Sequence, residues 1–290
     1  MFILSYNIKF NELDEKIEKL QINDIFNVFY ESPLEIITDE YGYGYVEKTI
    51  DIIEIKITYD EDRDNLNSFI EKISSLLETD YLNIEEVNPD YENYNFPIVH
   101  INDNWVLASP DEVINDKNIN KISFISQGAF GTGLHETTKD LLNIILTKID
   151  LSNKTVLDIG TGSGILSIAT AISGASKVTA LDIRDVTEEV KLNASLNGLY
   201  NIEILVGNAL TEEVKINNKY DWIYINIGGE ETELFMDLIN NHLKKDGKIL
   251  VSGLVEWSFD KVKLIIENYH FKLEEKYQTN EWITAIFNKY

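Results

Sequence analysis

The sequence of 290 residues predicts an α/β protein in which a doubly wound parallel sheet follows a small ferredoxin-like α/β domain. Three observations predict this fold class. From Lys121 onward, short aliphatic runs alternate with stretches of helical period, as in sheets built from β-α-β units. A glycine-dense turn follows the aliphatic run that begins at Thr155. Residues 1–90 instead follow the order β-α-β-β-α-β.

The pattern of residues 1–90 supports the smaller domain. Residues 50–59 alternate strictly, with Ile53, Ile55 and Ile57 on one face, which indicates a half-buried strand. Apolar residues then recur at helical spacing over residues 66–77. The segment Tyr41-Gly-Tyr-Gly-Tyr45 could stack on an aromatic ligand, but a hairpin turn is the favoured interpretation. The remaining strands are predicted at residues 2–8, 25–30, 36–46 and 84–87, with turns around the middle two, and another helix at residues 13–20.

The distribution of proline and glycine places the domain boundary. All four prolines precede residue 111, whereas 13 of the 15 glycines lie at or after Gly128. We therefore expect a small α/β domain at residues 1–90, a linker at residues 91–120 and the doubly wound domain at residues 121–290. Within the linker, residues 98–101 are expected to be extended.

Composition restricts the class of partner and the compartment. With 25 basic and 50 acidic residues, the chain has a net charge of −25, which disfavours direct nucleic-acid binding and favours a basic partner. The absence of cysteine excludes disulfides and fits a reducing cytoplasm. No apolar run approaches the roughly 20 residues that a membrane span needs, so no membrane association is expected. The histidines lack metal-ligand spacing, and no metal site is predicted.

The most specific motif is the glycine-dense turn itself. Gly160, Gly162 and Gly164 permit the close approach of the main chain to a ligand. Such a turn is also found at dinucleotide sites. Asp158, two residues before the first glycine, favours S-adenosyl-L-methionine instead, because a carboxylate there suits a cationic amino group better than a pyrophosphate.

Polar residues at the ends of the next strands complete the expected site. Asp182 ends the run that begins at Lys177, where a doubly wound nucleotide-binding fold places an acid for the ribose hydroxyls. Asn208 follows the third strand, near the expected adenine. Asn226 ends the fourth strand, and its amide oxygen could orient a nucleophilic N–H group. A strand-end turn asparagine is the alternative for Asn226.

Upstream of the glycine-dense turn, Gly128-Ala-Phe-Gly-Thr-Gly-Leu-His-Glu-Thr-Thr138 opens an apolar helix. Its glycines would let the chain fold over a ligand, and Thr137 or Thr138 would cap the helix. His135 could act as a base. A packing or loop hydrogen-bonding role for His135 is the favoured interpretation.

Together these motifs resemble the ribosomal protein L11 methyltransferase family in order and spacing. The residues that carry the resemblance are Ala129-Phe-Gly-Thr-Gly-Leu-His-Glu-Thr-Thr138, Leu157-Asp-Ile-Gly-Thr-Gly-Ser-Gly-Ile-Leu-Ser-Ile-Ala169, Leu181-Asp-Ile183, Asn226-Ile227 and Glu281-Trp282. The resemblance is detailed from about residue 121 and only architectural before that. It departs from the family pattern at Ser126-Gln127, Glu136 and Gly228-Gly229.

The resemblance implies a seven-stranded Rossmann-like domain that transfers methyl groups from S-adenosyl-L-methionine to amino groups of ribosomal protein L11. It implies that residues 1–90 recognise the substrate. Among the site residues, Thr138, Gly160, Asp182 and Asn226 fall on positions that the family uses to bind S-adenosyl-L-methionine. The alternatives are a methyltransferase for RNA or a small molecule, and a non-catalytic protein that binds the same cofactor.

Overall fold

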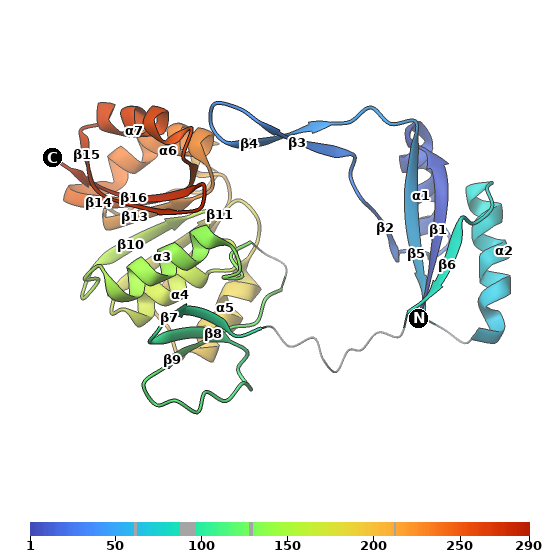
Figure 1. The fold of residues 1–290 in the computed structure, drawn as a ribbon, viewed down its shortest axis with the longest axis horizontal. Coiled ribbons are helices and arrows are strands. Elements are labelled where there is room, and N and C mark those ends of the chain that lie inside the picture. The colour runs from blue at the N-terminus through green and yellow to red at the C-terminus, as the bar shows by residue number, and fades with distance from the viewer. Residues whose placement is uncertain (61–62, 88–96, 128–129, 212) are drawn as a thin grey trace. The chain divides into compact units, whose positions relative to one another are not determined.

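The computed structural model describes residues 1–60, 63–87, 97–127, 130–211 and 213–290 (Figure 1). Contacts between residues divide the chain into two compact units. The first consists of Met1–Ile37 and Tyr43–Tyr94, and the second of Thr38–Gly42 and Asn95–Tyr290.

The first unit is a four-stranded antiparallel sheet in the order β2-β5-β1-β6. This order, with one helix after β1 and another after β5, is the split β-α-β arrangement of a ferredoxin-like fold. A separate two-stranded sheet, β3-β4, is inserted between β2 and β5. The elements are β1 Phe2–Lys9, α1 Leu13–Ile22, β2 Val28–Tyr30, β3 Leu34–Thr38, β4 Tyr43–Glu47, β5 Ile52–Tyr59, α2 Leu66–Leu77 and β6 Asn83–Glu86.

The core of the first unit follows the two periodicities of its sequence. In β5, Ile53, Ile55 and Ile57 are buried while the residues between them are exposed, as the alternating pattern predicts. Helix α2 buries Ile73 and Leu77 against the same sheet. Alternate apolar residues in the strands and helically spaced residues in the helices therefore meet in one cluster.

The second unit is built on a seven-stranded sheet in the order β12-β11-β10-β13-β14-β16-β15 (Figure 1). Strands β10 to β14 pair in parallel, and β16 pairs antiparallel with both β14 and β15. The strands are β10 Thr155–Ile159, β11 Lys177–Asp182, β12 Ile202–Val206, β13 Tyr220–Asn226, β14 Leu243–Val255, β15 Phe271–Thr279 and β16 Trp282–Lys289. The predicted alternation of strands and helices is confirmed, and the sheet ends in the antiparallel pair β15 and β16.

Helices cover both faces of this sheet (Figure 1). They are α3 Glu136–Thr147, α4 Ile165–Ile172, α5 Thr187–Leu196, α6 Gly229–His242 and α7 Phe259–Asn268. Val156 and Tyr224 face one apolar cluster with α3 and α4, whereas Leu157 and Ile225 face a second cluster with α6 and α7. Because both faces are covered, successive residues of the central strands β10, β11 and β13 are buried, and burial does not alternate along them.

Most of the segment that the sequence assigned to a linker is ordered structure in the second unit. Strands β7 Val99–Asn102, β8 Trp105–Ala108 and β9 Asn120–Ser123 form a small sheet, in which β8 and β9 pair in parallel. Val99, Leu107 and Ile122 join the cluster that includes α3 and α4. β9 has the sequence Asn-Lys-Ile-Ser, with one apolar residue, so its pairing with β8 and not a local pattern reveals it as a strand.

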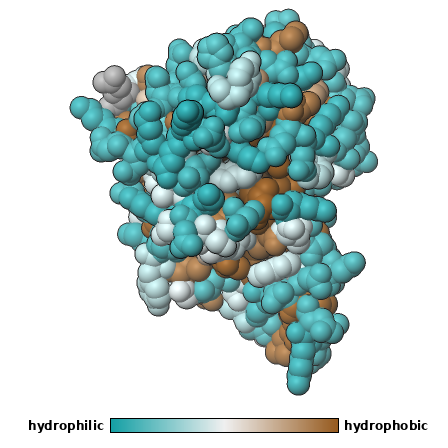
Figure 2. All heavy atoms as spheres, turned by 90° about the vertical axis from the view of Figure 1, so that its left-hand side faces the viewer, coloured by the Kyte–Doolittle hydropathy of each residue, from teal (hydrophilic) through white to brown (hydrophobic). Residues whose placement is uncertain are grey.

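Hydrophilic residues dominate the face of the molecule that Figure 2 draws, and hydrophobic residues gather in a band across its middle. Within the part of the chain that the structure describes, no helix is long and apolar enough to cross a membrane. The described residues also contain no group of three histidine, cysteine, aspartate or glutamate side chains that could hold a metal ion.

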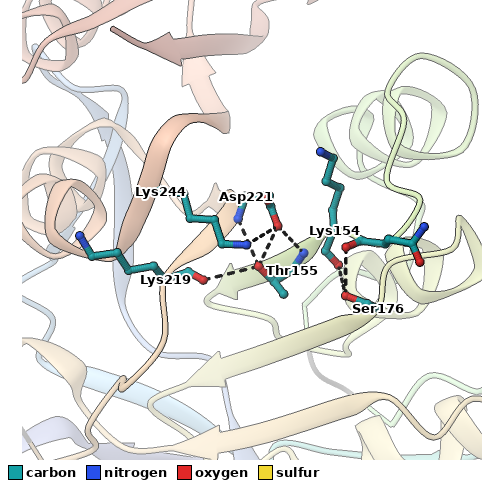
Figure 3. A network of polar contacts seen from close by, with 7 residues as sticks. Lys154, Thr155, Ser176, Lys219, Asp221 and Lys244 are labelled. Carbon is teal, nitrogen blue, oxygen red and sulfur yellow. Dashed lines mark hydrogen bonds and ion pairs between the residues drawn. The ribbon is translucent and has the colours of Figure 1, made fainter.

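A polar network joins the amino ends of two central strands of the large sheet (Figure 3). The Asp221 carboxylate accepts hydrogen bonds from the Thr155 main-chain nitrogen and hydroxyl, at 2.8 and 2.9 Å, and from Lys244 Nζ at 2.8 Å. Burial raises the pKa of Asp221, but these hydrogen bonds outweigh burial and hold the pKa below its usual range. This network therefore favours the ionised carboxyl in the folded state.

Replacing Asp221 by asparagine should lower the free energy of unfolding by about 1 to 2 kcal/mol at pH 7. The lowered pKa contributes stability that is complete above the unfolded value of about 3.9 and is lost as the pH falls through the folded value. Urea unfolding at pH 7 and at about pH 3 measures this loss. Glu188→Gln, at an exposed site, is the control. A difference of equal size at both pH values would contradict the assignment.

Candidate active site at the carboxyl edge of the sheet

A cavity of about 450 Å³ lies at the carboxyl ends of β10, β11 and β13. In a doubly wound sheet, the ends of neighbouring parallel strands meet at one edge, where ligands bind. Its volume is within the range of about 300 to 1,000 Å³ that is usual for small-molecule sites. Of the residues predicted for the site, the structure brings five into its wall: Gly160, Gly162, Asp182, Asn208 and Asn226.

The glycine-dense turn forms one wall of the cavity. Gly160 and Gly162 have φ values of 69° and 54°, in the left-handed region that favours glycine. A Cβ atom on Gly162 would lie 2.5 Å from the carbonyl oxygen of Phe130, and one on Gly160 would lie 2.8 Å from Ile227. Gly164 instead faces Val190 of α5 at 2.8 Å, so it permits two helices to pack closely.

Replacing Gly162 by alanine should destabilise the protein more than the same change at Gly198. Both glycines have positive φ, but a Cβ atom on Gly198 has open space around it. We expect Gly198→Ala to cost about 1 kcal/mol from its φ value, and Gly162→Ala about 2 kcal/mol more from the clash with Phe130. Urea unfolding of the two variants measures the difference. Equal stabilities would rule out a close main-chain approach at Gly162.

Asp182 connects the end of β11 to the glycine-dense turn. The residue is 7% exposed and belongs to the cavity wall. Oδ2 accepts a hydrogen bond from the main-chain nitrogen of Gly162 at 2.9 Å, and Oδ1 accepts one from that of Arg184 at 3.0 Å. These two bonds hold the carboxylate in one orientation, which leaves further acceptor capacity on each oxygen.

Asp158 lies beneath the turn and not in the cavity wall. It is 1% exposed, and its Oδ2 accepts hydrogen bonds at 2.7 Å from both Thr161 Oγ1 and Ser167 Oγ. Burial raises the pKa of the Asp158 carboxyl, in opposition to these hydrogen bonds. Asp158 thus joins the turn to the first part of α4. The sequence predicted that its carboxylate would contact a cationic amino group of the ligand, but Asp158 does not line the cavity.

The two predicted asparagines lie at different ends of the cavity wall. Asn226 ends β13, is partly exposed and is paired with Ser252 of β14. Asn208 follows β12, and its Oδ1 accepts a hydrogen bond from the main-chain nitrogen of Leu210 at 2.9 Å. The Asn208 oxygen is therefore used within its own turn, which leaves its amide group as a donor.

His135, and neither threonine, caps helix α3, so the expectation for Thr137 or Thr138 was wrong. The His135 Nδ1 atom accepts a hydrogen bond from the main-chain nitrogen of Thr137 at 3.3 Å. Its ring meets Trp282 edge-on, with 4.7 Å between centroids. These contacts account for His135 through capping and packing. Thr138 is 1% exposed, and its hydroxyl has no hydrogen-bond partner among the described residues.

The upstream motif lies against the glycine-dense turn. Phe130 and Gly131 accept hydrogen bonds through their carbonyl oxygens from the Ser163 main-chain nitrogen and hydroxyl, at 3.0 and 2.9 Å. Phe130 also belongs to the cavity wall. Gly128 and Ala129, the first residues of the motif, lie outside the described residues. From Phe130 onward, the segment therefore contacts the glycine-dense turn and the cavity, as expected.

Sequence reasoning missed the part of the wall that α6 and two loops provide. These residues include Arg184, Leu210, Glu231, Leu234 and Phe235. Helix α6 begins directly after β13, so its first turns lie at the carboxyl edge. Its apolar positions follow the ordinary helical pattern of a core face, and that pattern does not distinguish a cavity wall from a core.

The fold and the cavity define the class of protein. The sheet has the classical doubly wound order except that the last, antiparallel strand lies between the fifth and sixth. With a glycine-dense turn and an acid at the next strand end, this is the fold of S-adenosylmethionine-dependent methyltransferases. The chain belongs to the ribosomal protein L11 methyltransferase family, because the family model described as ribosomal protein L11 methyltransferase (PrmA) matches residues 8–290.

Individual relatives agree with this assignment. A ribosomal protein L11 methyltransferase of Fusobacterium nucleatum subsp. nucleatum is 31% identical over 299 residues, which cover 95% of this chain and 94% of the relative. One from Lactobacillus johnsonii is 40% identical over 156 residues, 53% of this chain and 48% of the relative. The crystal structure of ribosomal protein L11 methylase from Lactobacillus delbrueckii subsp. bulgaricus is 28% identical, with a TM-score of 0.59, and covers 67% of this chain and 99% of that one.

Proposed function

We propose that this protein transfers methyl groups from S-adenosyl-L-methionine to amino groups of ribosomal protein L11. The observation that supports this most is the single cavity that unites the glycine-dense turn, Asp182 and Asn226. The relatives named above support the choice of acceptor. The net charge of −25 also favours encounter with a basic protein over encounter with a phosphate backbone.

The residues present fit the cofactor. Gly160 and Gly162 leave main chain where any side chain would intrude, and the fixed carboxylate of Asp182 is suited to accept hydrogen bonds from ribose hydroxyls. Asn208 would offer its amide group to the adenine. Asp158 and Gly164 would contribute by holding the turn and helix α4 in place.

Thr138 is the remaining residue that we assign to the cofactor site, although it does not line the cavity. Its buried hydroxyl has no partner among the described residues, which is costly unless a ligand or water supplies one. Transfer to an amine that is already neutral requires no general base in the site. Asn226 would orient the acceptor instead.

The chemistry requires alignment of a neutral amine. S-adenosyl-L-methionine, when bound, supplies a methyl group on a sulfonium ion. A lysine amine with a pKa near 10.4 costs about 4 to 5 kcal/mol to deprotonate at pH 7, which desolvation in the site would offset in part. The amide oxygen of Asn226 would accept a hydrogen bond from the neutral amine and orient its lone pair.

Labelled S-adenosyl-L-methionine and a ribosomal extract test the proposal. Label in ribosomal protein L11 would support it. Label in RNA or in small molecules would favour the alternative acceptors, and no label despite cofactor binding would favour a non-catalytic binding protein. Mass spectrometry of the labelled band identifies which amines are modified and how many methyl groups each receives.

A further inference from the structure

Residues Thr38–Gly42, here called the 38–42 loop, belong to the second unit although the residues on either side fall in the first. The loop is tightly turned, because Asp39 Oδ1 accepts hydrogen bonds from the main-chain nitrogens of Tyr41 and Gly42 at 2.8 and 2.9 Å. Within the second unit, Tyr41 packs on the apolar cluster that includes α6 and α7. The sequence pattern predicted a hairpin turn here but not this packing.

Three side chains of the second unit contact the 38–42 loop through hydrogen bonds, an ion pair and a cation–π contact. The Tyr41 hydroxyl donates a hydrogen bond to Glu233 of α6 at 2.5 Å. Lys261 of α7 lies 3.4 Å from the centroid of the Tyr41 ring and forms an ion pair with Glu40 at 2.9 Å. Trp257 Nε1 donates to the carbonyl oxygen of Asp39 at 3.2 Å. A cation over an aromatic face adds to the hydrogen bonds.

The 38–42 loop also touches the segment that follows Asn226. Gly229 is the first residue of α6, and a Cβ atom on it would lie 3.1 Å from the carbonyl oxygen of Tyr41. From β14, a Cβ atom on Gly253 would lie 2.9 Å from the carbonyl oxygen of Ile227. The main chain of Ile227 thus lies close to Gly253, and Gly229 lies close to the main chain of Tyr41. Asn226 directly precedes this segment.

We infer that the 38–42 loop is a clamp on the first turn of α6, and that Tyr41 is a positioning residue for Asn226. The inference rests on the proposed function for its catalytic consequence, because Asn226 has its assigned role only there. Tyr41 acts through Glu233 and the main chain of Gly229, whereas the glycine-dense turn follows β10 and Asp182 ends β11. Loss of the clamp should therefore reduce turnover more than cofactor affinity.

Three variants of the full-length protein test the clamp. Tyr41→Ala removes the ring and the hydroxyl, and Tyr41→Phe removes only the hydrogen bond to Glu233. Tyr45→Ala removes a tyrosine of β4 that is 66% exposed and is the matched control. Amide hydrogen exchange of residues 229–236 measures the clamp directly. Methyl transfer to a ribosomal extract gives kcat and KM, and calorimetry gives the S-adenosyl-L-methionine Kd.

We expect Tyr41→Ala to speed exchange in residues 229–236 and to lower kcat on the order of 10-fold, with Kd within about threefold. Tyr41→Phe should keep most of the turnover, and Tyr45→Ala should match the wild type. Unchanged exchange in Tyr41→Ala would overturn the clamp, and faster exchange with unchanged kcat would overturn the positioning role. If the wild type methylates nothing, the proposed function fails, while the exchange result still decides the clamp.

Discussion

Replacing Asp182 by alanine should weaken S-adenosyl-L-methionine binding about 100-fold or more, because hydrogen bonds to a charged group are worth about 1.5 to 3 kcal/mol each. The change removes the proposed acceptor for two ribose hydroxyls. It also leaves the main-chain nitrogen of Gly162 without the partner that it has at 2.9 Å. Calorimetry with the purified protein measures the affinity.

Two further variants test whether the loss of affinity comes from the lost hydrogen-bond acceptors of Asp182 or from the loss of one negative charge. Asp182→Asn keeps one acceptor oxygen and should lose less affinity than alanine. Glu188→Ala removes an equal charge from the exposed start of α5 and should bind as the wild type does. Wild-type affinity in Asp182→Ala would remove this residue from the ribose site.

Replacing Asn226 by alanine should lower kcat on the order of 100-fold while the Kd for S-adenosyl-L-methionine stays within about 10-fold. The Asn226 amide would orient the acceptor amine for attack on the methyl group. Its loss should therefore lower the rate of methyl transfer more than the affinity for the cofactor. Steady-state methyl transfer gives kcat and KM, and calorimetry gives the Kd on the same preparations.

The control for Asn226 is Asn217→Ala, at an exposed asparagine on the loop before β13. That variant should match the wild type in every measurement. If Asn226→Ala turns over as fast as the wild type, alignment of the amine must depend on other groups. If it loses cofactor affinity and turnover equally, Asn226 serves binding and not orientation.

Parts of the fold could be predicted from the local sequence pattern, where the spacing of apolar residues or glycines sets the conformation of a whole strand or turn. Alternation in β5 marked its buried face, and glycines at positions 160, 162 and 164 marked the turn after β10. Topology then supplied the site, because parallel strands place their carboxyl ends at one edge. Asp182 and Asn226 are 44 residues apart in sequence, yet their positions at strand ends were enough to bring them together.

The roles of other residues depend on tertiary contacts that the local sequence pattern does not reveal. Asp158 and Asp182 are both acids at strand ends, but only the tertiary structure decides that Asp158 is buried beneath Thr161 and Ser167. The capping role of His135 depends on where its ring lies relative to the Thr137 main chain. In each case, packing distances decide between roles that the residue type allows equally.

By itself, the sequence determined the order of strands and helices in the seven-stranded sheet, the edge at which a ligand would bind and the family of the protein. These features depend on periodicity and on glycine at positive φ, which are properties of neighbouring residues. Only the tertiary structure decided that residues 97–120, expected to be linker, belong to the second unit and that the 38–42 loop packs on α6 and α7. Such contacts join segments distant in sequence, and their free energy depends on shape and burial that no single segment contains.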